Sequence, residues 1–125
     1  MNSKVFMVVR ILLGLFVLVF GLNKFFNFIP MGEMPEAAGS YFGALASAKV
    51  IPYLVGVVEI AAGVALLLNK YGALMALILM SISVNAVLFH ATLAPDSIAG
   101  ALLLLVLNVL AIVGYKDRYA DLLRA

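Results

Sequence analysis

The chain has 125 residues, of which 66% are hydrophobic and 11% charged, with a formal net charge of +2 and a mean hydropathy of +1.22. Soluble domains carry about 25% charged residues, so this composition excludes an ordinary soluble protein and predicts one membrane domain over residues 1–125. The absence of cysteine excludes disulfide and iron–sulfur chemistry, and a single histidine offers little to a metal, so we expect no metal site.

Four apolar segments follow one another, and each is long enough to cross a bilayer, which takes a helix of about 20 residues. Alternation of polar and apolar residues at period two is absent, so a β-barrel is not expected. The sequence therefore predicts an all-α integral membrane four-helix bundle. Its helices are expected at about residues 5–29, 50–68, 72–91 and 97–115.

The connections between these segments differ in kind. Residues 69–72 and 94–97 are short and turn-like, which predicts antiparallel neighbours. Residues 30–49 are longer, and Pro35 followed by Glu36 is typical of a helix start. We expect a short helix there on the outer surface of the membrane, with a disordered loop as the alternative. Residues 118–125 are expected to form a small tail helix.

Basic residues are distributed unevenly between the two predicted sides of the membrane. The side with both termini carries six, and the opposite side carries only Lys24 and Lys49. Cytoplasmic loops are enriched in Lys and Arg, so we expect a multi-pass protein of a bacterial inner membrane with both termini in the cytoplasm. These residues are spread over several loops, so no nucleic-acid surface is expected. The six are Lys4, Arg10, Lys70, Lys116, Arg118 and Arg124.

The polar residues of the predicted spans share a depth. Glu59 is the one acid of its span, near the centre, where insertion of an acidic residue costs roughly 2.5–3.5 kcal/mol. With a rise of about 1.5 Å per residue, Glu59 lies about 14 Å below the outer membrane surface. The other polar residues lie between that surface and a depth of about 16 Å. We therefore expect an outward-facing polar pocket with Glu59 near its floor. The candidate residues are Asn23, Lys24, Glu59, Asn85, His90 and Asn108.

Small and charged residues also repeat at helical spacing on the first two predicted spans. Residues three, four and seven apart share a helix face, and small residues let a neighbouring backbone approach. Packing the two stripes together would bring Lys24 toward Glu59. The stripes are Gly14, Gly21 and Lys24 on one helix and Gly56, Glu59 and Gly63 on the other.

The motifs resemble those of the DoxX-like family of small membrane proteins. The similar segments are Arg10 to Leu15, Phe20 to Phe26, Gly56 to Gly63 and Asn85 to His90, within a resemblance that covers about Arg10 to Gly114. The resemblance implies a four-helix bundle. It also implies a link to membrane oxidoreductases, because some relatives are subunits of thiosulfate:quinone oxidoreductases, whereas distant relatives assist receptor assembly or cargo export.

Two functions follow as hypotheses, and whether the chain is an enzyme stays open. In the first, the chain is the membrane subunit of an oxidoreductase system and binds a quinone-like or other amphipathic molecule. Glu59 then handles a proton, Lys24 sets its charge, and Asn85 or His90 contacts the headgroup, with Asn23 and Asn108 nearby. Expected partners are the bilayer, a redox enzyme and a second copy of the chain.

In the second hypothesis, the chain is a non-catalytic scaffold or assembly factor. Glu59 then forms a structural ion pair, Lys24 pairs with it or extends to the lipid headgroups, and the asparagines hydrogen-bond between helices. A transporter or channel is a weaker third alternative, because four short helices enclose only a narrow pore.

Overall fold

The computed structural model describes residues 1–30 and 32–125, and that part of the chain is helical without strands. Four of its helices are long and apolar enough to cross a membrane. The predicted all-α fold with four spans and one short helix, α2 (Glu36–Ala48), is therefore confirmed. The long helices are α1 (Ser3–Phe26), α3 (Val50–Leu68), α4 (Gly72–Leu93) and α5 (Ile98–Gly114).

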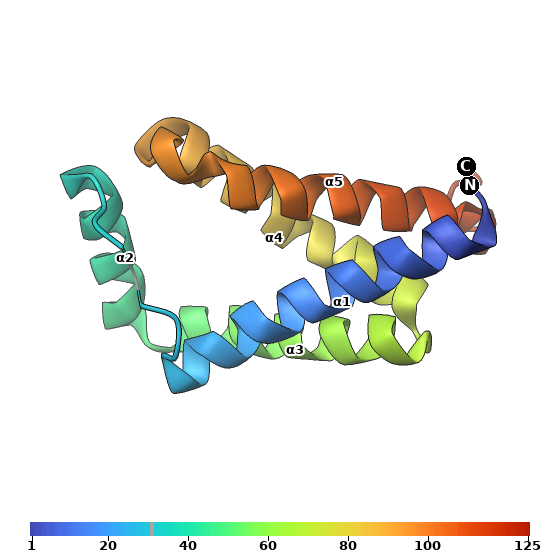
Figure 1. Cartoon of the computed structure of the whole chain (residues 1–125), viewed down its shortest axis with the longest axis horizontal. Helices are drawn as coiled ribbons and strands as arrows, with labels where there is room; N and C mark the ends of the chain where they lie inside the picture. Colours follow the sequence, from blue (N-terminus) through green and yellow to red (C-terminus); the bar gives the residue numbers. More distant parts are fainter. Residues whose placement is uncertain (31) are drawn as a thin grey trace.

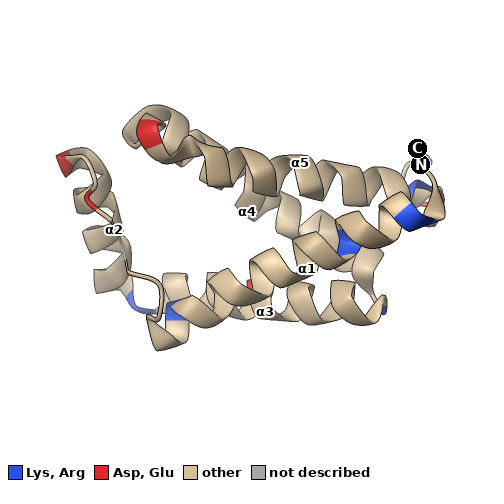
Figure 2. Ribbon diagram, in the orientation of Figure 1, with Lys and Arg blue, Asp and Glu red and all other residues tan. Residues whose placement is uncertain are grey.

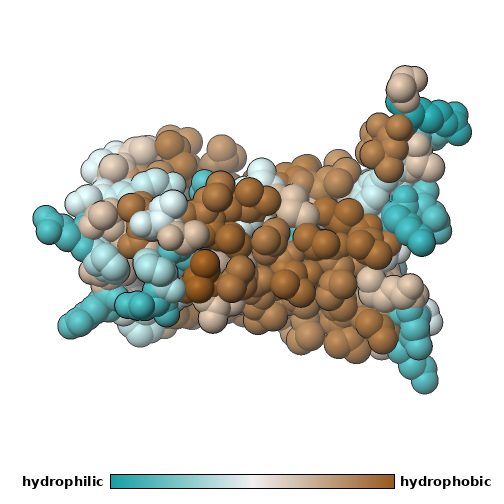
Figure 3. Space-filling model, turned by 90° about the horizontal axis from the view of Figure 1, so that it is seen from above, coloured by the Kyte–Doolittle hydropathy of each residue, from teal (hydrophilic) through white to brown (hydrophobic). Residues whose placement is uncertain are grey.

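The four long helices form a ring in which α1 contacts α3 and α5, and α4 contacts the same two neighbours. Figure 1 shows the pair α1–α3 and the pair α4–α5 converging where the two chain termini lie and separating toward the other end. There α2 lies across the bundle. We call these the terminal end and the α2 end. Figure 3 shows a broad hydrophobic band between hydrophilic ends, which is the surface expected of a protein in contact with lipid.

The buried core is divided in the same way. Its main cluster joins residues of all four long helices, such as Leu13, Leu66, Leu79 and Leu107, and reaches Tyr119 at the terminal end. A smaller cluster at the α2 end contains Ala38, Phe89 and Ala94. Tyr41 and Phe42 of α2 pack on Phe89, with ring centroids 5.1 and 4.8 Å apart. The short helix α2 is thus held on the bundle by aromatic contacts.

Side chains and backbone conformation decide where α1 begins and ends. Asn2 accepts hydrogen bonds from the backbone N–H groups of Lys4 and Val5 at 2.7 and 3.3 Å, which caps the start. Asn27 adopts a left-handed conformation with φ of 51°, so α1 ends at Phe26 rather than near the expected Ile29.

The terminal end is closed by side chains that bind the turn between α3 and α4. The guanidinium of Arg10 donates from Nη1 to the carbonyl oxygens of Leu66 and Leu67, at 2.5 and 3.2 Å. These are among the last carbonyls of α3, which the regular hydrogen bonds of the helix do not reach, and the Leu66 carbonyl also accepts from the backbone N–H of Asn69 at 3.3 Å. From the other side, the Tyr115 hydroxyl donates to Asn69 Oδ1 at 2.7 Å. The turn is therefore fixed by α1 and by the segment after α5.

The expected tail helix over residues 118–125 is wrong. The chain instead forms the 3₁₀ helix η2 (Lys116–Tyr119) and then turns. This tighter path places the Tyr119 side chain inside the bundle end, where its hydroxyl donates to the Ala73 carbonyl at 2.7 Å. A buried hydroxyl needs such a partner. The segment therefore turns inward at Tyr119 and does not form the separate helix that the sequence predicts.

Stability should fall at alkaline pH because of Tyr119. Burial, with a smaller contribution from Tyr115, raises the pKa of Tyr119 from 10 to about 12. Between these values the unfolded chain loses the proton that the folded chain keeps, so stabilisation present below pH 10 disappears as the pH rises through the window. We expect Tyr119→Phe to have a lower melting temperature than the wild type at pH 8. Between pH 10 and 12, its melting temperature should fall by less than that of the wild type. Tyr71→Phe is the control, since Tyr71 is 81% exposed, and an equal fall in melting temperature for all three proteins would contradict this account.

Candidate functional site

Helices α1 and α3 approach each other through paired glycines. A Cβ atom added at Gly63 would lie 2.9 Å from the Gly14 carbonyl oxygen, and one added at Gly21 would lie 3.0 Å from that of Gly56. Cβ atoms are essentially never found within 3.0 Å of another heavy atom, so a side chain at Gly63, or at Gly21 where Glu59 Cβ would lie 2.9 Å away, would push the two helices apart. The predicted packing of the two glycine stripes is confirmed.

This close approach brings Lys24 and Glu59 into contact. Lys24 Nζ lies 2.5 Å from Glu59 Oε1, with side chains that are 31% and 5% exposed respectively. No described residue meets Glu59 Oε1 with the angles of a regular hydrogen bond, so its partner is the Lys24 charge at ion-pair distance. The carboxylate is thus enclosed between two helices, while its cationic partner keeps part of its surface open.

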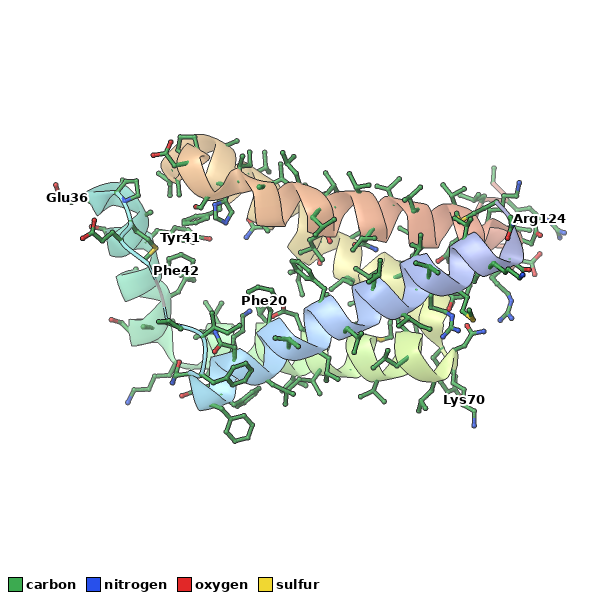
Figure 4. All side chains as sticks on the ribbon, viewed as in Figure 1. Phe20, Glu36, Tyr41, Phe42, Lys70 and Arg124 are labelled. Atoms are coloured by element: carbon green, nitrogen blue, oxygen red, sulfur yellow. The ribbon has the colours of Figure 1, made fainter. Side chains whose placement is uncertain are left out.

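Two aromatic side chains of α1 lie near Lys24, since Phe25 follows it and both residues contact the α3 backbone at Gly56. Phe25 stacks on Tyr53 with centroids 5.3 Å apart, and Phe20 lies one helical turn before Lys24 and contacts Phe16. Phe20 is 39% exposed. Figure 4 shows Phe20 directed from α1 toward the α4–α5 pair, and Tyr41 and Phe42 directed from α2 toward the bundle. The pair therefore has apolar rings beside its accessible side.

Three of the other candidate residues are occupied by contacts within the fold. The Asn23 side-chain oxygen accepts from the Ile29 backbone N–H at 2.7 Å and shapes the chain after α1. His90 Nδ1 lies 3.0 Å from Ser97 Oγ, at the turn before α5. Asn108 is fully buried, accepts from the Ser83 hydroxyl at 2.6 Å and donates to the Ala76 carbonyl at 3.0 Å, which joins α5 to α4.

Asn85 is different, because it is exposed and no hydrogen bond links it to another residue within the described ranges. It lies about 160° around α4 from Ser83 at 100° per residue, and so on the side away from α5. The structure therefore does not bring the six candidate residues into one cluster. It brings together Lys24 and Glu59 and places the others at separate positions.

Two polar contacts were not anticipated from the sequence. Ser83 is not among the candidate residues that the sequence indicates, although its seven-residue spacing from Ala76 puts both on one face of α4 and toward Asn108. Arg10 was counted only as a charge, although it lies four residues before Gly14 on the face that meets α3. Helical spacing was a usable signal in both cases.

Two hollows, of about 590 and 290 Å³, lie at the terminal end, and neither borders Lys24 or Glu59. Among residues 1–30 and 32–125, no three His, Asp or Glu side chains gather as metal ligands would. The outward-facing pocket remains a prediction.

A comparison with protein-family models identifies the family of the chain. The family model DoxX matches residues 5–92, which include α3, all but the last residue of α4 and both members of the ion pair. The chain belongs to the DoxX family. No curated protein and no solved structure matches it. For this DoxX protein the matched region covers the α1–α3 glycine contact, whereas Asn108 lies outside it.

The glycine contact can be tested by adding one methyl group. In the DoxX protein, Gly63→Ala would place a Cβ 2.8 Å from Leu18 Cβ and 2.9 Å from the Gly14 carbonyl oxygen. Such overpacking typically costs about 1–3 kcal/mol, so we expect a lower midpoint in denaturation by sodium dodecyl sulfate. Gly100→Ala is the matched control, because no atom lies within 4 Å of its added Cβ. Equal stability of the two variants would show that α1 and α3 do not pack this closely.

A double-mutant cycle tests the ion pair. Lys24→Met leaves the enclosed Glu59 without its partner, and such a loss costs about 3–5 kcal/mol for a buried pair. Glu59→Gln should cost less, because the partly exposed Lys24 can turn toward water or headgroups. The double variant should be more stable than the sum of the two losses indicates. Additive losses, measured by the same denaturation assay, would mean that the two side chains do not interact.

Proposed function

We propose that this DoxX protein is the membrane subunit of an oxidoreductase system and binds a quinone-like, amphipathic molecule beside the Lys24–Glu59 pair. One observation carries the proposal: within the apolar spans, Glu59 is enclosed while its partner Lys24 keeps 31% of its side chain exposed. An ionisable pair held in a span is costly and is a functional candidate by default. The ammonium of this partly exposed lysine carries hydrogen-bond donors that could also serve a ligand oxygen.

The surroundings of Lys24 suit a ring-bearing ligand. Ligand sites are mostly apolar with a few placed polar groups, and Phe20 and Phe25 supply rings on the same helix as Lys24. In the proposed complex the Lys24 ammonium donates to a carbonyl oxygen of the ligand. Glu59 holds the ammonium in place and is the candidate for exchanging a proton with the ligand. Asn85, with its amide unengaged, is a second candidate donor, whereas His90 is already bound to Ser97.

The redox part of the proposal rests on the family resemblance and on the composition. The sequence lacks cysteine and has one histidine, so it contains few of the side chains that ligate redox metals. Electron transfer to a bound quinone would then take place with a partner protein. The DoxX protein would contribute the ligand site within the membrane, and a second copy of the chain is a further candidate partner.

The charge distribution supports an orientation with both termini in the cytoplasm of a bacterial inner membrane. Six basic and two acidic residues at the terminal end give +4, whereas Lys24 and Lys49 against Glu33, Glu36 and Asp96 give −1 at the α2 end. Figure 2 shows basic residues at the terminal end and acidic residues on α2 and before α5. The positive end is the expected cytoplasmic one, which places the proposed ligand site toward the outer face.

A scaffold role is the second candidate, and a specific observation favours it. Asn23, His90 and Asn108 all have partners within the fold, so their contacts stabilise the bundle without any ligand. Under this alternative the Lys24–Glu59 pair also serves only to join α1 to α3.

Quinone binding to the purified protein in lipid nanodiscs distinguishes the two candidates. We expect decyl-ubiquinone to bind the wild type saturably and Lys24→Met to bind at least about tenfold more weakly, a change of roughly 1.4 kcal/mol. Lys49→Met removes the same charge from the same end, outside the pair, and should bind like the wild type. Glu59→Gln should alter the pH dependence of binding.

Two results would contradict the proposal. One is an absence of saturable binding by a folded wild-type protein, and the other is equal affinity of Lys24→Met and Lys49→Met. If either is found while the stability losses of the ion-pair variants remain, the scaffold role is the better account.

A further inference from the structure

The larger hollow, of about 590 Å³, lies at the terminal end between the start of α4 and the segment after α5. Its apolar wall includes Leu74 and Leu77 of α4, which are 54% and 38% exposed. Its rim carries Lys70 from the α3–α4 turn and Arg118 from η2. An apolar wall is thus joined to two cations in one depression.

The depth of these residues matches the boundary of a membrane. Helix α4 begins at Gly72, so Leu74 and Leu77 lie about 3 and 8 Å into the span at 1.5 Å per residue. Lys70 and Arg118 lie just outside the apolar helices. The hollow therefore runs from the hydrocarbon region to the level of the lipid phosphates.

Neither Lys70 nor Arg118 forms an ion pair with residues 1–30 or 32–125. Within the described part of the chain, no carboxylate lies within 4 Å of Lys70 or Arg118, and Asp121 is instead paired with Arg124 at 3.3 Å. Arginine presents a planar fork that matches phosphate oxygens, and lysine adds a compact charge. Two cations on the rim of an apolar hollow at the end of a membrane helix are a suitable site for an acidic headgroup.

Hydrogen bonds join the two segments that carry Lys70 and Arg118, although these segments are far apart in the sequence. The Tyr119 hydroxyl donates to the Ala73 carbonyl, and the Tyr115 hydroxyl donates to Asn69 Oδ1. These bonds flank Arg118 on one segment and Lys70 on the other. The rim is therefore set by the fold before any ligand binds.

We propose that this hollow binds an anionic phospholipid. Its phosphate lies between the Lys70 ammonium and the Arg118 guanidinium, and one acyl chain lies along Leu74 and Leu77. The site is separate from the proposed quinone site, which is at the α2 end, and does not depend on it.

The test compares lipids with the same acyl chains and different headgroups, added to the full chain in a neutral detergent. We expect dioleoyl phosphatidylglycerol to raise the melting temperature and to bind at least tenfold more tightly than dioleoyl phosphatidylcholine in native mass spectrometry. Inorganic phosphate at the same concentration should have no effect, because it lacks the acyl chain.

Matched variants locate the site. Lys70→Gln/Arg118→Gln should lose the preference for phosphatidylglycerol, whereas Lys4→Gln/Lys116→Gln removes two charges from the same end outside the hollow and should keep it. Both members of each pair are exposed, and the single variant Arg118→Gln, with an expected partial loss, substitutes if the double variant does not fold. The proposal is overturned by equal loss in both double variants, by no lipid preference in the wild type, or by an equal effect of inorganic phosphate.

Discussion

The close contact between α1 and α3 is the constraint on which the rest of the bundle depends. Glycines at two levels let the backbones touch, and Leu18 and Ile60 fill the space around them. At this separation, Lys24 and Glu59 meet at 2.5 Å. With larger residues at the glycine positions the helices would stand apart, and Glu59 would lie in the span without a counter-charge.

The same contact explains how polar groups are tolerated in the apolar part of the molecule. Lipid offers no hydrogen bonds, so polar groups within a span need partners inside the protein. Glu59 has Lys24, Asn108 has Ser83 and Ala76, and Arg10 has the last carbonyls of α3. Each of these contacts joins two different helices. The polar residues therefore find their hydrogen-bond or ion-pair partners in the bundle and also fix how the helices are aligned with one another.

The two ends of the bundle differ in how tightly they are packed. At the terminal end, Arg10, Tyr115 and Tyr119 fasten the α3–α4 turn, and the main core continues to that level. At the α2 end, the helix pairs separate and the core is a small cluster around Phe89 (Figure 1). Local opening is easiest where few buried contacts resist it. Entry of an amphipathic molecule near Lys24 is therefore compatible with a terminal end that stays closed.

The sequence by itself determined the class of the fold, the four spans and the glycine stripes that bring Lys24 toward Glu59, whereas the structure decided that Lys24 pairs with Glu59 and that a helix begins at Glu36. Hydrophobic length and helical spacing are local properties, and the glycine stripes carry enough pattern to specify one helix pair. Only the tertiary structure decided that Asn108 binds Ser83, that Arg10 caps α3, that the tail turns inward at Tyr119, and that Lys70 and Arg118 share a rim. These contacts depend on how each helix is rotated and shifted against its neighbours. That rotation and shift arise from the packing of all the helices together, which no single segment encodes.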